Sequence, residues 1–231
     1  MDFTKAIDLN PNLSLAYYNR GFIYSLKNLF EKAILDFSKT IEINPNDIEA
    51  YYNRGTAYYT IGLNDKAIND FTKVIEINPQ FVDAFFNRGL AYASKGLYEK
   101  AIADQTKVIS INPQYADAYC NRGNSYKNKG LLDNAINDYT KAIDLNPQDA
   151  DAYNNRAGAY TDKGLYDEAI ADVTKAIDFN PQDAWAYFNR GLAYKNKGLD
   201  DKAKQDFKKA GELFEEQEKT EEAIKAFQMA E

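Results

Sequence analysis

The sequence predicts an all-α fold, an α-solenoid in which antiparallel helix pairs are stacked in series. The first observation behind this prediction is the spacing of the prolines, each of which follows an asparagine and recurs every 34 residues: Pro11, Pro45, Pro79, Pro113, Pro147 and Pro181. The second is that small and aromatic residues recur in fixed columns with the same period. A strict period of this length is typical of repeat arrays rather than of one globular domain.

Each repeat is numbered so that its proline falls at position 32. Full repeats then begin at Ser14, Ile48, Val82, Ala116, Ala150 and Ala184. The spacing therefore predicts six full repeats over residues 14–217, preceded by a half repeat over residues 1–13 that holds a second helix only. Residues 218–231 follow the last repeat and are expected to form a C-terminal capping helix.

The first half of each repeat is predicted to be a helix with one apolar face. Position 4 is aromatic (Tyr17, Tyr51, Phe85, Tyr119, Tyr153, Tyr187), and so is position 11 (Tyr24, Tyr58, Tyr92, Tyr126, Tyr160, Tyr194). Position 8 is glycine in five repeats and Ala157 in the fifth. Because residues three and four apart share a helix face, positions 4, 8 and 11 lie together, and the small residue lets a second backbone approach.

The second half of each repeat is predicted to be a helix antiparallel to the first. Position 20 is always alanine (Ala33, Ala67, Ala101, Ala135, Ala169, Ala203), and positions 24 and 27 continue the same face. A glycine at position 15, such as Gly62, can end the first helix in the left-handed conformation. The Asn-Pro pair ends the second helix, since the residue before proline avoids helical geometry.

Composition excludes several classes of function. The net charge of -7 disfavours a nucleic-acid partner, and the absence of a long apolar run excludes a membrane-spanning helix. The chain has no histidine, the commonest general base and metal ligand, so we expect no catalysis, no metal site and no cofactor. Its single cysteine, Cys120, has no candidate base and is interpreted as a small apolar groove residue. One cysteine cannot form an internal disulfide, which favours a reducing, cytoplasmic location.

The two ends differ from the repeats between them. Thr220, followed by two glutamates, has the pattern of a helix start and predicts a capping helix over residues 220–230; one long helix running on from residue 201 is the alternative. At the other end Phe3, Ala6, Ile7 and Leu9 are expected to form a second-type helix without a first-type partner before it, so either the natural protein continues upstream or this edge packs on another molecule. An open edge of this kind can self-associate or pack on another molecule.

These columns resemble the tetratricopeptide repeat family over essentially the whole chain. The aromatic–Gly–Tyr–Ala–aromatic–Pro signature of that family is read in Tyr51, Gly55, Tyr58, Ala67, Phe71 and Pro79. The resemblance implies a right-handed superhelix whose first helices line the concave face. Gln105 and Val173 depart from the aromatic at position 24 and are expected to weaken packing locally, and Glu215 replaces the next proline.

Position 7, usually a large aliphatic residue in that family, is arginine in every repeat. Position 23 is aspartate in every repeat, and Asp2 matches it in the half repeat. We predict that each arginine pairs with an aspartate where the two helices meet. An arginine row that binds phosphate or carboxylate ligands is the less favoured interpretation, because the acids would neutralise it.

By resemblance, position 6 faces the concave groove, where an amide can bond to the backbone of an extended peptide. It is asparagine throughout: Asn19, Asn53, Asn87, Asn121, Asn155 and Asn189. The alternatives are an asparagine on the helix surface that is bonded within its own repeat, or a packing residue common to the family. Further candidate groove residues are Tyr18, Tyr52, Phe86, Glu49, Asp83, Asp117 and Lys127. The three aromatic residues fit either the groove or a contact with the next repeat.

These residues predict a non-catalytic scaffold that binds a peptide or partner segment in the groove. A row of aromatic side chains beside carboxylates suits a ligand with apolar anchors and basic character. The carboxylate clamp by which some family members bind acidic chaperone tails is disfavoured, because no lysine occupies position 2 or 5. The alternatives are a structural module that stacks end to end and the recruiting arm of a larger protein.

Overall fold

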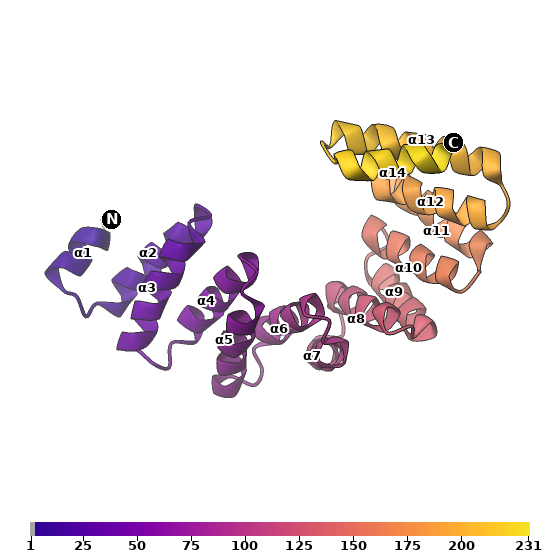
Figure 1. Cartoon of the computed structure of the whole chain (residues 1–231). Coiled ribbons are helices and arrows are strands. Elements are labelled where there is room, and N and C mark those ends of the chain that lie inside the picture. The colour runs from indigo at the N-terminus through magenta and orange to yellow at the C-terminus, as the bar shows by residue number, and fades with distance from the viewer. Residues whose placement is uncertain (1–2) are drawn as a thin grey trace. The chain divides into compact units, whose positions relative to one another are not determined.

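The computed structural model describes residues 3–231 and confirms the all-α solenoid. Within that range helices are the only regular secondary structure, and they pack as successive antiparallel pairs (Figure 1). Asp2, which the sequence assigns to the arginine–aspartate series, lies outside the described residues.

The helices fall into two compact units, Met1–Pro113 and Gln114–Glu231. The first unit holds α1 (Phe3–Leu9), α2 (Ser14–Leu26), α3 (Phe30–Ile43), α4 (Ile48–Thr60), α5 (Asn64–Ile77), α6 (Val82–Ser94) and α7 (Tyr98–Ile111). The second unit holds α8 (Ala116–Asn128), α9 (Leu132–Leu145), α10 (Ala150–Asp162), α11 (Tyr166–Phe179), α12 (Ala184–Asn196), α13 (Asp200–Glu216) and α14 (Thr220–Ala230). The helices α2, α4, α6, α8, α10 and α12 are called the first helices below.

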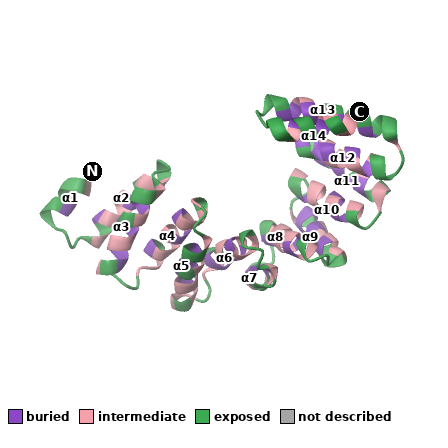
Figure 2. Ribbon diagram, in the orientation of Figure 1, coloured by how far each residue is buried: buried purple, intermediate pink, exposed green. Residues whose placement is uncertain are grey.

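Inside each unit the core lies between the two helices of a repeat and against the next first helix. Figure 2 shows the buried residues on the facing sides of the helices. The two helices of one repeat, such as α2 and α3, share a more extensive contact than α3 shares with α4, the next first helix. Successive first helices touch one another, as α2 touches α4 and α10 touches α12, whereas the described second helices have no comparable contact. The first helices therefore line the inner face of each unit.

The glycine at position 8 is required by the side chain opposite it, which is an aromatic ring in four repeats and Gln105 in the third. A Cβ atom added to Gly123 would lie 2.8 Å from the ring of Tyr139, which is fully buried. In the fifth repeat position 8 is Ala157, and the residue opposite is Val173 instead of an aromatic. The two departures compensate, because the smaller valine leaves room for the alanine methyl group. Both side chains are buried in the same cluster.

The turn inside each repeat uses a left-handed residue. Gly62, for example, has φ of +78°, a conformation that costs a glycine little. Asn28 in the first repeat and Glu218 after α13 take the same conformation, with φ of 57° and 59°. Each second helix of the full repeats before α13 ends before Asn-Pro, as at Asn44, which is extended.

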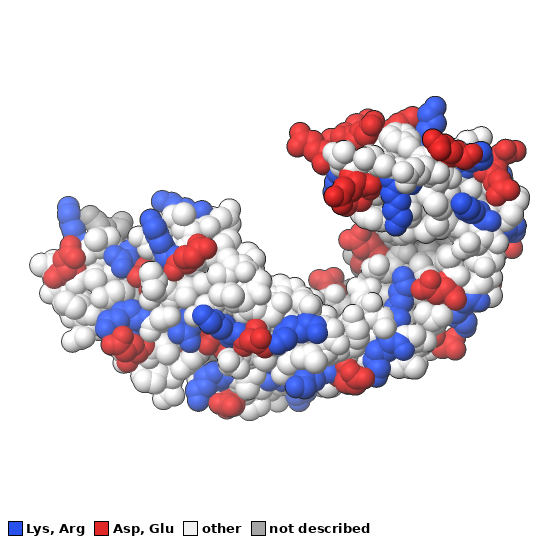
Figure 3. All heavy atoms as spheres, viewed as in Figure 1, with Lys and Arg blue, Asp and Glu red and all other residues white. Residues whose placement is uncertain are grey.

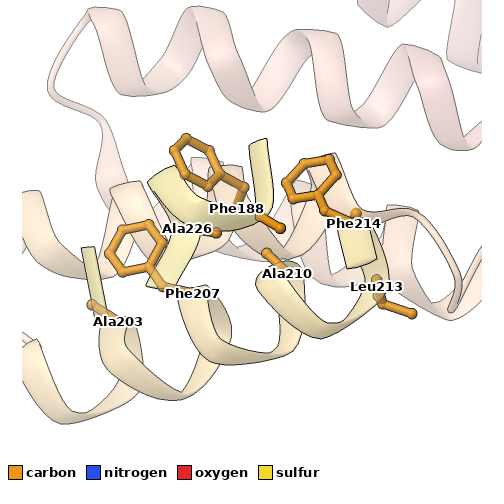
Figure 4. Packing of buried hydrophobic residues seen from close by; sticks show 9 residues of the cluster. Phe188, Ala203, Phe207, Ala210, Leu213, Phe214 and Ala226 are labelled. Atoms are coloured by element: carbon orange, nitrogen blue, oxygen red, sulfur yellow. The ribbon is translucent and has the colours of Figure 1, made fainter. Parts of the chain in front are cut away.

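The helix α13, which has 17 residues where α11 has 14, acts as the second helix of one pair and as the first helix of another. It is the second helix of the last repeat, with Phe207 facing Gly191. It also pairs with α14 as a first helix would, since Phe227 faces Gly211 with the same spacing. Figure 4 shows Phe207, Phe214 and Ala226 within this one cluster. The final hairpin thus repeats the packing of a repeat in a shifted register.

Candidate functional site

The predicted arginine–aspartate pairing is confirmed in all six repeats. In each, arginine Nε donates to aspartate Oδ2 and Nη2 donates to Oδ1 at 2.7–2.9 Å. The pairs are Arg20–Asp36, Arg54–Asp70, Arg88–Asp104, Arg122–Asp138, Arg156–Asp172 and Arg190–Asp206. The two-pronged geometry joins the two helices of one repeat.

A hydroxyl group from the preceding repeat completes the arginine's surroundings. Nη1 of Arg54 donates to Ser38 at 3.0 Å, and Nη1 of Arg88 donates to Thr72 at 3.0 Å. Sequence reasoning missed this contact, although position 25 is serine or threonine in every repeat before the last. The guanidinium also lies between the aromatic rings at positions 4 and 11, as Arg88 does at 5.6 Å from Phe85. Each arginine is therefore committed to the scaffold.

The asparagine row on the inner face divides into two groups. Three members donate to the position 5 side chain of the preceding repeat: Asn53 to Tyr18 at 3.1 Å, Asn87 to Tyr52 at 3.0 Å and Asn189 to Asn154 at 2.9 Å. These bonds tie successive first helices together. In the described part of the chain, the side-chain amides of Asn19, Asn121 and Asn155 have no such bond, and all three residues are half-buried.

The aromatic candidates are half-buried and face both neighbours. Tyr18 packs at 5.8 Å from Phe37 of its own repeat while its hydroxyl accepts from the next repeat. Tyr52 packs at 6.0 Å from Phe71 in the same manner. The backbone carbonyl of Phe86 accepts from Nε2 of Gln105 at 3.1 Å, and Gln105 leaves its Oε1 buried without a partner among the described residues. These rings thus contribute to packing and also border the inner face.

The charged candidates lie at the two ends of the first helices. Glu49, Asp83 and Asp117 are exposed in the first turns of α4, α6 and α8. Lys127, near the end of α8, reaches across to Gly158 on α10. A Cβ atom added to this glycine would lie 2.7 Å from the Lys127 Nζ. It approaches Asp162 at 3.7 Å and borders a cavity of about 170 Å³ with Thr161 and Asn189. The inner face is therefore acidic where first helices begin, and Lys127 adds a cation further along.

The chemistry available on this face is that of hydrogen bonding and apolar contact. Burial, together with the carboxylates of Asp149 and Asp117, raises the pKa of the Cys120 thiol to about 12. A thiol with so high a pKa is a poor nucleophile. Figure 3 shows cationic and acidic side chains interleaved over the visible surface of each unit. None of the helices in residues 3–231 combines the length and apolar character needed to cross a bilayer.

Sequence models of the tetratricopeptide repeat match residues 14–47, 48–81 and 116–149, residues 71–103 and 138–171, and residues 186–213. A further model, described as TPR repeat, matches residues 91–130 and 157–198. The chain belongs to the tetratricopeptide repeat family. No curated protein matches this tetratricopeptide repeat chain.

Solved structures of tetratricopeptide repeat proteins share the fold. YrrB, described as a TPR protein with an unusual peptide-binding site, is 26% identical, with a TM-score of 0.68 over 80% of this chain and 96% of its own. A MamA structure is 34% identical, with a TM-score of 0.65 over 75% of this chain and 95% of its own. A tetratricopeptide repeat protein from Parabacteroides merdae is 24% identical, with a TM-score of 0.76 over 98% of this chain and 90% of its own. These neighbours indicate a protein-interaction scaffold.

Proposed function

We propose that the inner face formed by the first helices binds a peptide or a segment of a partner protein. The observation that carries this proposal is the pair of half-buried amides of Asn121 and Asn155, which have no hydrogen-bond partner among the described residues. An asparagine amide can donate to a carbonyl and accept from an N–H group of an extended backbone. The other members of the row support the surface, since Asn53, Asn87 and Asn189 hold neighbouring first helices together.

The chemistry of the face favours a ligand with apolar anchors and basic side chains. The exposed acids Glu49, Asp83 and Asp117 lie in the first turns, beside half-buried rings such as Tyr52. A cationic residue of the ligand can pair with the acids while an apolar residue packs on a ring. YrrB, whose description includes a peptide-binding site, supports peptides as the first ligands to test.

A peptide-array screen against the full chain tests this proposal. The hits are then measured by fluorescence anisotropy with wild type and with the double variant Asn121→Ala/Asn155→Ala. Each amide that bonds to a ligand should account for about threefold to tenfold in Kd. The matched control is Asn137→Ala, which removes an exposed amide from α9, away from the first helices. Hits whose binding is unchanged by the double variant would contradict the proposal.

The same proposal describes a non-catalytic protein of the cytoplasm. The absence of histidine and the raised pKa of Cys120 support a binding role, and the lone cysteine supports a reducing compartment. No cluster of three potential metal ligands occurs among the residues that the structure describes.

Self-association through the N-terminal edge is the second candidate. Position 10 is small and buried in repeats two to six, where it packs on the preceding second helix, as Ala159 packs on Ala135. In the first repeat this position is Ile23, which is 38% exposed. Light scattering over a range of concentrations tests the idea: oligomers that dissociate in Ile23→Ser support it, and a monomer at every concentration contradicts it.

A further inference from the structure

The first repeat presents an apolar stripe that the other repeats lack. Its positions 2, 9 and 13 are Leu15, Phe22 and Leu26, which are 63%, 43% and 70% exposed. In every other repeat at least one of these positions is polar, charged or glycine; the second repeat, for example, has Glu49, Thr56 and Thr60 there. Residues spaced by seven and four share one face of a helix, so the three side chains form a continuous ridge along α2.

The ridge borders a cavity at the start of α2. Ser14, Leu15, Tyr18, Asp47 and Glu49 line about 250 Å³. The ring of Tyr18 stacks with that of Phe22 at 6.5 Å between centroids and an angle of 14° between planes. The Tyr18 hydroxyl accepts a hydrogen bond from Asn53, which fixes the wall of the cavity. The cavity therefore joins an apolar wall to two carboxylates at the start of α4, from the N-cap residue Asp47 and from Glu49 in the first turn.

The electrostatic field at this end of the stripe is negative. Burial raises the pKa of Tyr18, and the charges of Glu49 and Asp47 raise it further. One Asp47 oxygen caps α4 by accepting from the Ala50 backbone N–H. The Glu49 carboxylate has no hydrogen-bond partner among the described residues, and it is exposed. The opposite end of the stripe carries the exposed cation Lys27.

We infer that the stripe of Leu15, Phe22 and Leu26 docks an amphipathic helix of a partner protein that carries arginine or lysine at the end facing Asp47 and Glu49. This inference rests on the proposed function and names the partner class for the first repeat. The stripe spans roughly 16 Å, about three helical turns at 1.5 Å per residue. A straight ridge of that length fits the groove of another helix, and the acids select its basic end.

The test uses the full chain and a three-turn synthetic peptide, labelled with fluorescein, that has leucines along one face and two arginines at one end. Anisotropy should detect binding to wild type. The variant Leu15→Glu/Phe22→Thr/Leu26→Thr places the second repeat's own side chains on α2, so the fold is expected to tolerate them. Its affinity should fall about tenfold or more. The matched control is Leu35→Asn, which replaces a leucine of α3 that is 70% exposed with the residue of the second repeat.

Charge is tested with a second peptide that carries glutamates in place of the arginines. Wild type should bind it more weakly, and Glu49→Gln should reduce that preference. The inference would be overturned if the peptide bound wild type and the triple variant with equal affinity. It would also be overturned if a peptide with the leucines in scrambled order bound wild type as tightly as the original peptide. A wild-type dimer in sedimentation that the triple variant abolishes would overturn it as well, because a second copy would then occupy the stripe.

The two proposals can fail separately. In one outcome, the array hits bind Asn121→Ala/Asn155→Ala more weakly but bind the triple variant as well as wild type, and the amphipathic peptide does not bind. This outcome would leave the proposed function standing and would overturn the helix site. Hits that ignore both sets of changes would overturn both.

Discussion

Replacing Arg190 with methionine should destabilise the last repeats strongly. Its guanidinium holds Asp206 through bonds of 2.7 and 2.9 Å, and the two side chains are only 17% and 10% exposed. Hydrogen bonding to Asp206 raises the pKa of Arg190 despite its partial burial. Methionine would leave the Asp206 carboxylate buried without its partner. Breaking a buried pair from one side costs about 3–5 kcal/mol, so we expect a loss of about 3 kcal/mol in this partly exposed case.

The single tryptophan makes the effect local and measurable. Trp185 lies on the same helix and contacts Phe214 edge-on at 5.0 Å. Its fluorescence should therefore follow the unfolding of α12 and α13 in urea, and amide hydrogen exchange of the same helices gives the opening free energy. A loss of about 3 kcal/mol corresponds to about a hundredfold increase in local opening.

Two variants separate the ion pair from other causes. Arg190→Met/Asp206→Ala removes both charges and should recover most of the loss, because no buried charge remains. The final hairpin shows that the chain accepts this arrangement, since Ala210 and Ala226 occupy the corresponding places and are fully buried. Lys197→Met removes an exposed pair with Asp167 and should change little. An Arg190→Met protein as stable as wild type, or a double variant as unstable as Arg190→Met, would refute the reasoning.

Three further predictions concern packing, the turns and the thiol. Gly123→Ala should lower the free energy of unfolding by about 1–3 kcal/mol, since the methyl group meets the Tyr139 ring; adding Tyr139→Val, the combination of the fifth repeat, should cost less than the two single changes together in urea titrations. Glu218→Gly should raise the midpoint of thermal unfolding, because a φ of 59° costs glycine about 1 kcal/mol less than it costs glutamate. A lower midpoint would contradict this prediction. Iodoacetamide should alkylate Cys120 slowly at pH 8, because burial raises its pKa to about 12 and keeps it protonated, and rapidly in guanidinium; equal rates would show that the thiol is accessible.

The sequence predicted the parts of the fold that lie within one repeat. Arg88 and Asp104 recur together in every copy, so their pairing could be inferred without coordinates. The bond from Asn87 to Tyr52 was harder to foresee, because it joins position 6 of one repeat to position 5 of the one before. The bond forms only where the side chain at position 5 of the preceding repeat accepts a hydrogen bond. Cys120 occupies that position before Asn155 and does not accept one from it.

The end of the array was harder to predict because the period breaks there. The sequence indicated a helix start at Thr220, but the double use of α13 appears only when Gly211 and Phe227 are aligned with Gly191 and Phe207. The compensation between Ala157 and Val173 is also not evident from the sequence, because the two residues depart from the pattern in different columns. In both cases the decisive information is the distance between two side chains, which a column of residue types does not contain.

Site-specific photo-crosslinking tests the central claim that the first helices form the binding face. Benzoylphenylalanine is placed either at Thr161, on α10 beside the cavity that Lys127 borders, or at Asn137, exposed on α9. The tightest peptide from the array is then added to each variant and irradiated. We expect a crosslinked product, competed by unlabelled peptide, from position 161 and none from position 137. A product from position 137 alone would show that the ligand binds elsewhere.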